Sequence, residues 1–136
     1  MEHQLSFERL IRYDAGQPGI TVETTLKLLE KRVNLTAKVD TGATYCVFER
    51  KLGLSLVINI EDGPEQPIST ATGRLLTFGH EVTLAVGGFE FDSIAYFAAD
   101  TALKRNVLGR HGWLDRIVLG LVDYEGKLLL SRYSGD

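Results

Sequence analysis

The 136-residue chain has little of what marks several large functional classes. Its single cysteine, Cys46, excludes an internal disulfide and fits a reducing compartment. Its three histidines, His3, His80 and His111, are scattered and lack the spacing of metal ligands, so we expect no metal or other cofactor. No run of basic residues occurs and the formal net charge is -3, which argues against nucleic acid as a partner.

Long apolar stretches are missing as well. No segment is long and apolar enough to span a bilayer, and residues 1–9 are polar, without the apolar region of a signal peptide. We therefore expect no membrane contact and a cytoplasmic location. Hydrophobic residues nevertheless make up 44% of the chain, which is enough to bury a core, and the length is typical of one domain over residues 1–136.

A β-strand pattern dominates the rest of the chain. Apolar residues alternate at period two over residues 20–28 and 33–39. Turn residues predict a hairpin around Gly87-Gly88 and a second one, over residues 68–79, with Gly73 at its centre. Further strands are expected over residues 93–98, 114–122 and 127–133. Many short strands separated by turns predict an all-β fold that closes into a β barrel.

Two short helical segments are expected among these strands. Residues 49–53 could form one helical turn that Gly53 closes. A short helix is predicted near the C-terminus, from Arg110 to Leu114.

The strand over residues 33–39 leads directly into Asp40-Thr41-Gly42-Ala43-Thr44. This order places a short acidic side chain on a tight turn. Gly42 lets the backbone turn with no Cβ in the way, and Ala43 is small enough for a substrate backbone to lie close. Taken alone, the four residues Asp-Thr-Gly-Ala could also be a plain turn with Asp40 as its capping residue.

Asp-Thr-Gly-Ala resembles the signature of aspartic peptidases residue for residue, and it occurs once. An aspartic peptidase needs two carboxylates that face each other, because they share one proton and activate one water. The resemblance is therefore to the retropepsin-like family, the single-domain, retroviral-type aspartic peptidases that act as symmetric homodimers. It implies an aspartic endopeptidase in which Asp40 of two chains meets across a twofold axis. Thr41 and Gly42 would fix the carboxylate, and Thr41 would also bond across the axis.

Two more segments resemble the family in the expected order. Residues 68–78 follow the catalytic loop, where the family has its flap, the hairpin that closes over an extended peptide substrate. The resemblance assigns substrate binding to residues of the loop and of the flap: Ala43, Thr44, Thr70, Ala71, Thr72, Gly73 and Arg74. Asn106-Val107-Leu108-Gly109-Arg110 resembles the family's second signature, a strand that supports the catalytic loop from behind.

One departure from the viral pattern concerns Thr44. Retroviral enzymes usually have an acid there that pairs with the Arg after the second-signature Gly, whereas Thr44 cannot pair with Arg110. We therefore expect Arg110 to face water or bind another group. Ser or Thr at this position is frequent in cellular and bacterial relatives, so the resemblance favours that branch over a viral one.

Two other functions fit parts of the same pattern. A non-catalytic dimerisation or peptide-binding module on the same fold would keep the dimer and the groove but would have no turnover. Residues 40–44 also fit the Asp-x-Gly-x-Thr phosphate loop of actin-like ATPases. Those proteins need two large α/β lobes, and this chain has neither the length nor the helices. Asp100-Thr101-Ala102, which looks like a second copy of the motif, lacks the Gly and is expected to be a loop or capping turn.

Overall fold

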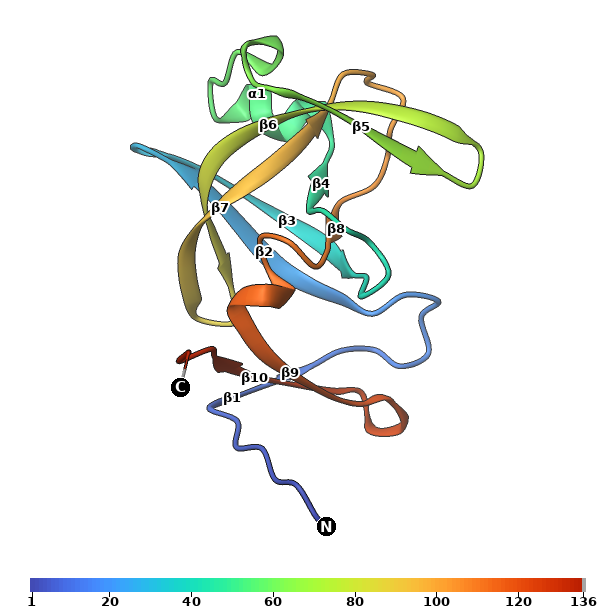
Figure 1. Cartoon of the computed structure of the whole chain (residues 1–136), viewed down its shortest axis with the longest axis vertical. Coiled ribbons are helices and arrows are strands. Elements are labelled where there is room, and N and C mark those ends of the chain that lie inside the picture. The colour runs from blue at the N-terminus through green and yellow to red at the C-terminus, as the bar shows by residue number, and fades with distance from the viewer. Residues whose placement is uncertain (136) are drawn as a thin grey trace.

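The computed structural model describes residues 1–135, and in that range the alternating segments of the sequence form ten β-strands in two sheets (Figure 1). The strands are β1 (Arg9–Arg12), β2 (Thr21–Leu28), β3 (Lys31–Val39), β4 (Val47–Phe48), β5 (Glu65–Thr70), β6 (Gly73–Val86), β7 (Phe89–Ala98), β8 (Val107–Leu108), β9 (Ile117–Val122) and β10 (Lys127–Arg132). The helical elements are α1 (Arg50–Ser55) and three 3-10 turns, η1 (Ile60–Asp62), η2 (Leu114–Arg116) and η3 (Asp123–Glu125).

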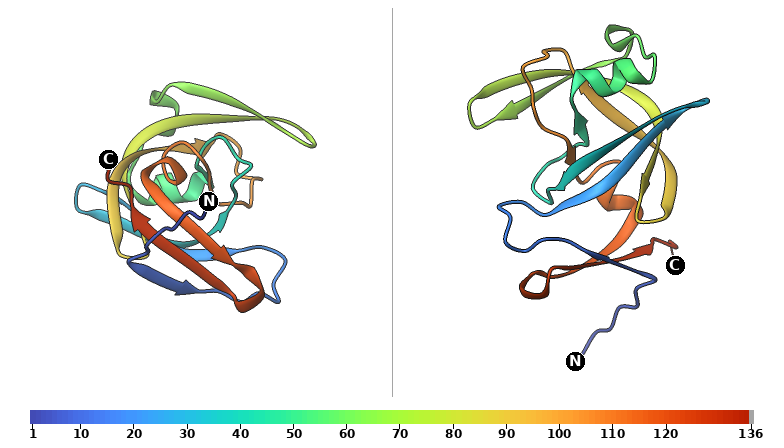
Figure 2. Two further views of the ribbon diagram at one scale, coloured as in Figure 1. Left: turned by 60° about the horizontal axis from the view of Figure 1, so that its bottom comes forward. Right: turned by 180° about the vertical axis from the view of Figure 1, so that it is seen from behind.

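The larger sheet closes on itself. Its strand order is β2-β3-β8-β4-β7-β6-β5, and β2 also pairs with β6. The strands from β2 to β6 in this order therefore form a ring, which agrees with the predicted closed all-β fold and leaves β5 paired to β6 alone. Figure 2 shows the strands curving around the interior of the ring from two further sides. A closed ring has no free edges apart from the projecting hairpin, which limits edge-to-edge association.

The core lies inside this ring, where the period-two patterns place their apolar side chains. On β3, Leu35, Ala37 and Val39 are buried while their neighbours are exposed. The rings of Phe48 and Phe97 are fully buried with their centroids 6.1 Å apart. Each such side chain contributes about 1.5–3 kcal/mol through burial of apolar surface. The alternation in the sequence therefore correctly predicts which face of each strand turns inward.

The smaller sheet has the order β1-β10-β9 and packs under the ring (Figure 1). Leu128 and Leu130 of β10 are fully buried and belong to the same core as the ring. The expected final strand pair is confirmed, with Leu128 opposite Leu121. The Gly87-Gly88 hairpin is also confirmed, because Val86 pairs with Phe89 and both glycines have positive φ.

Two details of the helix predictions were wrong. The short helix near the C-terminus is the single 3-10 turn η2 and does not run from Arg110 to Leu114, because Gly112 has a φ of 107°, which no helix residue adopts. The α-helix is α1, and Gly53 lies inside it and does not close it. A Cβ on Gly53 would come within 3.1 Å of the Phe97 ring, so its role is close packing of the helix on β7.

The hairpin predicted over residues 68–79 exists, but Gly73 is not at its centre. Thr70 pairs with Gly73, so the turn consists of Ala71 and Thr72, and Gly73 begins β6. The strand predicted over residues 93–98 is the second half of β7, which runs without a break from the Gly87-Gly88 turn. Over residues 1–135 the helices are all too short or too polar to cross a membrane.

Candidate active site

Asp40 lies at the C-terminal end of β3, in the turn that follows the strand. Its backbone N–H donates to the Leu108 carbonyl oxygen at 3.0 Å, and its own carbonyl oxygen accepts the Ala43 N–H at 3.1 Å. The Oδ1 atom of its side chain accepts the Gly42 N–H at 3.0 Å. The turn thus holds the carboxylate from its own backbone. The side chain is half-buried, so it is oriented by the protein and still reachable from solvent.

The support for this turn comes from β8. Strand β8 runs parallel to β3, with Lys38 opposite Val107 and Val39 opposite Leu108. It is also paired with β4, so it fills the space between the strands on either side of the Asp40 turn. The second signature therefore lies directly behind the turn, as the resemblance implies.

Gly109 permits the close approach of these two segments. A Cβ at this position would lie 2.3 Å from the Tyr45 carbonyl oxygen and 2.9 Å from that of Ala43. The absence of a side chain allows Arg110 N–H to donate to the Ala43 oxygen at 2.9 Å and His111 N–H to donate to the Thr44 oxygen at 2.8 Å. The loop from Asp40 to Tyr45 is therefore fixed at both ends and along one side. The Arg110 side chain is exposed, as expected.

Cys46 is buried under this junction. Its Sγ atom accepts the Gly109 N–H at 3.4 Å, and the residue is 1% exposed. Burial raises the pKa of the thiol to about 11, so it stays neutral at physiological pH. It acts as a small hydrophobic residue that also satisfies one backbone donor.

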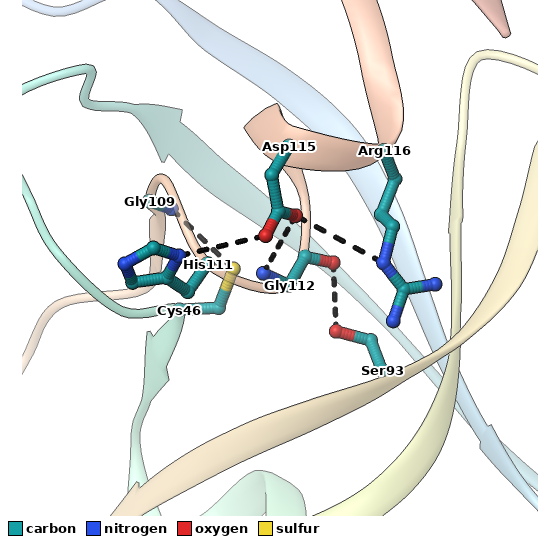
Figure 3. A network of polar contacts seen from close by, with 7 residues as sticks. All are labelled: Cys46, Ser93, Gly109, His111, Gly112, Asp115 and Arg116. Atoms are coloured by element: carbon teal, nitrogen blue, oxygen red, sulfur yellow. Dashed lines mark hydrogen bonds and ion pairs between the residues drawn. The ribbon is translucent and has the colours of Figure 1, made fainter. Parts of the chain in front are cut away.

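A network of polar contacts holds the turn after the second signature (Figure 3). The Asp115 carboxylate accepts the Gly112 N–H at 3.1 Å, and it lies 3.5 Å from His111 Nδ1 and 3.9 Å from Arg116 Nε. Ser93 Oγ donates to the Gly112 carbonyl oxygen at 2.7 Å. These contacts tie the turn to β7 and stabilise the backbone that supports the Asp40 loop. None of these side chains lines the cavity described below.

An open cavity of about 570 Å³ lies between the Asp40 loop and the β5–β6 hairpin, a volume within the usual range of ligand sites. Of the residues predicted for the site, it brings together Asp40, Gly42, Ala43, Thr44, Thr70, Ala71 and Thr72. Thr41, Gly73 and Arg74 do not line it, and all three are exposed. Their predicted roles in the dimer and at the flap stay predictions.

The cavity wall also contains residues that were not predicted as catalytic or substrate-binding: Tyr45, Val47, Pro67, Ile68, Ser69, Leu75, Leu103, Arg105 and Val107. Val47 and Val107 are opposite each other on β4 and β8, so strand pairing places them on one wall. Val107 lies inside the second signature, which was given only a supporting role, and Val47 follows the Asp40 loop closely. Leu103 and Arg105 come from the connection between β7 and β8, which has no recognisable motif.

The β5–β6 hairpin forms the opposite side of the cavity and projects from the ring (Figure 1). Thr70 Oγ1 donates to the Gly73 carbonyl oxygen at 2.9 Å, which fastens the two-residue turn. The φ of Gly73 is 140°, a value that favours glycine. β5 pairs with β6 alone, and β6 pairs with β7 only from Thr77 onward, so the end of the hairpin has no further strand beside it.

Charged groups on the cavity wall are few. Within the described part of the chain, Asp40 supplies the wall's carboxylate and Arg105 its cation. No group of three or more His, Cys, Asp and Glu side chains in residues 1–135 is arranged to hold a metal ion. The wall therefore offers one carboxylate and one guanidinium among apolar and hydroxyl side chains.

Comparisons with known proteins agree with this geometry. A family model described as Aspartyl protease matches residues 24–120, which include the Asp40 loop, the β5–β6 hairpin and β8. Among solved structures, the EIAV protease complexed with the inhibitor HBY-793 matches with a TM-score of 0.56 and 20% sequence identity. The match covers 74% of this chain and 88% of the EIAV protease chain, and it shows a shared fold. No curated protein matches the sequence.

Proposed function

The chain belongs to the aspartyl protease family, and we propose that it is a homodimeric endopeptidase in which Asp40 of each chain activates one shared water. The observation that carries the proposal is the setting of Asp40. Among the described residues it is the cavity's one carboxylic acid, and its loop is held by β8 from behind. A water-activating dyad needs a second carboxylate, and an identical chain related by a twofold axis supplies it.

The chemistry follows from two carboxylates held close together. They cannot both ionise, so the pair keeps one proton and titrates as a unit. The ionised carboxylate takes a proton from the water, which attacks the peptide carbonyl carbon. The protonated carboxylate donates to the carbonyl oxygen, and a proton later passes to the leaving nitrogen. The Gly42 N–H bond to Oδ1 of Asp40 supports this role because it favours one fixed orientation of the carboxylate.

The substrate is an extended peptide. The cavity is bounded on one side by the Asp40 loop and on the other by β5 residues such as Ile68 and Ser69. An extended chain between them can pair with the backbone of both, which is a recurring mode of peptide recognition. The hairpin would close over the bound peptide through its turn at Ala71 and Thr72.

The first test compares Asp40→Asn with wild type on a mixed peptide library. We expect the variant to lose cleavage and to keep its thermal unfolding midpoint, because asparagine retains the Gly42 contact and lacks the ionisable group. Asp100→Asn is the matched control, since Asp100 Oδ1 also accepts a backbone N–H, from Ala102 at 2.8 Å, and does not line the cavity. Cleavage that survives in purified Asp40→Asn would refute the mechanism.

A mixing experiment tests whether one site uses both chains. Wild type and Asp40→Asn are combined at constant total protein after dissociation and reassociation. If each dimer needs two Asp40 residues, activity follows the square of the wild-type fraction and falls to about a quarter in an equal mixture. A fall to about half would mean that each chain acts alone. A dimer by sedimentation that binds peptides without cleaving any would instead indicate a non-catalytic peptide-binding module.

A further inference from the structure

Arg105 places a positive charge on the same cavity wall as Asp40. We propose that Arg105 determines specificity, so that the enzyme prefers peptides with an aspartate or glutamate side chain close to the cleaved bond. The inference rests on the proposed function and names the substrate class of that site. It does not follow from the two sequence signatures, because Arg105 lies outside both.

The composition of the cavity wall makes the positive charge of Arg105 a distinguishing feature for a bound peptide side chain. Most of the other side chains around Arg105 on the wall are apolar or small, among them Val47, Leu75, Leu103 and Val107. An uncharged peptide side chain finds apolar contacts there. An acidic side chain finds a guanidinium, whose planar donors match a carboxylate in two-pronged geometry.

Arg105 is available to a ligand. Its side chain is exposed, and within residues 1–135 it takes part in none of the ion pairs or side-chain hydrogen bonds of the structure. A surface arginine with no internal partner has no structural contact to lose when a substrate carboxylate binds. Its charge can therefore be used for recognition.

The backbone beside Arg105 is fixed although its side chain is free. The Asn106 carbonyl oxygen accepts the Lys38 N–H at 2.8 Å. The Asn106 side chain accepts the Glu49 N–H at 3.0 Å and donates to the Glu49 carboxylate at 2.8 Å. Glu49 is 9% exposed, so this contact is shielded from water. These bonds anchor the end of the connection to β3 and to the residue after β4, and so fix the backbone next to Arg105.

The charge balance in the dimer favours an acidic ligand. The Asp40 pair keeps one proton, so the dyad carries one negative charge and would by itself repel an acidic side chain. Twofold symmetry gives two Arg105 side chains, one on each side of the cleaved bond. The site is then net positive, and an acidic residue on either side of the bond is attracted and not repelled.

The test uses peptide pairs that differ only in Glu against Gln, or Asp against Asn, at positions on each side of the cleaved bond. We expect wild type to favour the acidic member by about three- to tenfold in kcat/KM, the range of a partly screened ion pair. Arg105→Gln should abolish the preference, and Arg105→Lys should keep part of it. Raising the ionic strength to about 0.5 M should weaken it in wild type, because screening shortens the range of the charge.

Lys104→Gln is the matched control, since Lys104 is the exposed neighbour with the same charge and does not line the cavity. It should leave the preference unchanged. The inference is overturned if wild type shows no preference, if Arg105→Gln keeps it, or if Lys104→Gln removes it to the same extent. An equal loss for acidic and neutral peptides in Arg105→Gln would also overturn it, because Arg105 would then act on the dimer or on folding.

A binding measurement separates this inference from the proposed function. The same peptide pairs are titrated against Asp40→Asn, which holds the peptide without cleaving it, with and without Arg105→Gln. Tighter binding of the acidic peptide that depends on Arg105 supports the inference even if wild type cleaves nothing, in which case only the proposed activity fails. Equal binding of both peptides refutes the role of Arg105 even if cleavage is found.

Discussion

Gly109 is the position where a single methyl group should do most damage to the candidate site. In Gly109→Ala the new Cβ would lie 2.3 Å from the Tyr45 carbonyl oxygen and 2.7 Å from its carbon. Both are backbone atoms, so no side chain can rotate to relieve the contact. The two segments must separate by about 1 Å to reach an ordinary contact distance.

The size of the effect follows from what this separation breaks. Overpacking of this kind costs about 1–3 kcal/mol. The bonds from Arg110 N–H to Ala43 and from His111 N–H to Thr44 lie next to the clash, and each is worth about 1 kcal/mol. We therefore expect Gly109→Ala to lower the free energy of unfolding by about 3–5 kcal/mol, a large part of the about 5–15 kcal/mol typical of a folded domain. The thermal midpoint should fall by about 10 °C or more.

The cleavage rate should fall even at temperatures where Gly109→Ala is still folded. The same shift moves Ala43 and the Asp40 carboxylate next to it, and a misplacement of about 1 Å at a reacting group can cost about 100-fold in rate. Circular dichroism gives the midpoint, and peptide cleavage well below that temperature gives kcat/KM of the folded fraction. The expected result is a loss of both, with kcat/KM reduced by about 100-fold at a temperature where the variant is still folded.

Gly120→Ala is the control for this prediction. A Cβ there would also come close to another group, 2.7 Å from Phe7 Cζ, but that atom is the end of a side chain that can turn aside. We expect a change under about 1 kcal/mol and full activity. If Gly109→Ala matches Gly120→Ala in both measurements, the second signature does not support the Asp40 loop and the reasoning is refuted.

Two further predictions concern groups around the site. Burial raises the pKa of Cys46 from 9.0 to about 11, so the neutral thiol's contribution to stability is complete below pH 9 and is lost as the pH rises toward 11. In urea unfolding, the free energy of unfolding of wild type should fall by up to about 2.7 kcal/mol over this window, and that of Cys46→Ala should change less. Parallel pH profiles of the two proteins would contradict this prediction. Asn106→Ala leaves the buried Glu49 without two hydrogen bonds and should lower the free energy of unfolding by about 2–4 kcal/mol. The control is Asn34→Ala, which removes a single exposed contact to Thr25. Equal effects of the two substitutions would mean that the Asn106–Glu49 contact does not anchor the connection before β8.

Local sequence patterns correctly predicted the elements whose conformation depends mainly on neighbouring residues. The period-two alternation over β2 and β3 predicted both strands and their buried faces, since the pleat puts every second side chain on one side. The two glycines at 87 and 88 predicted the hairpin because glycine adopts positive φ at both turn positions without strain. The helix predicted from Arg110 to Leu114 was wrong because Gly112 has a positive φ, and the sequence shows the glycine but not its φ.

The cavity wall shows what local pattern could not supply. Asp40 and its neighbours were predicted from a motif, and the β5–β6 hairpin from the order of segments. Arg105 has no signal of its own, because its place depends on where β7 ends and where β8 enters the ring. Nothing in the residues between these strands shows that the connection passes the carboxylate. Such residues can be assigned only when the pairing of distant strands is known.

Three aspartates in this chain make the same local contact, and the comparison shows what sets Asp40 apart. The Oδ1 atom accepts the N–H two residues ahead at 2.9 Å for Asp14, 3.0 Å for Asp40 and 2.8 Å for Asp100. The turn alone therefore does not make a catalytic site. Only the Asp40 turn has a parallel strand behind it and the cavity in front, whereas Asp14 and Asp100 do not line that cavity. Since neither lines the cavity, the dyad that we propose takes its second carboxylate from Asp40 of a second chain.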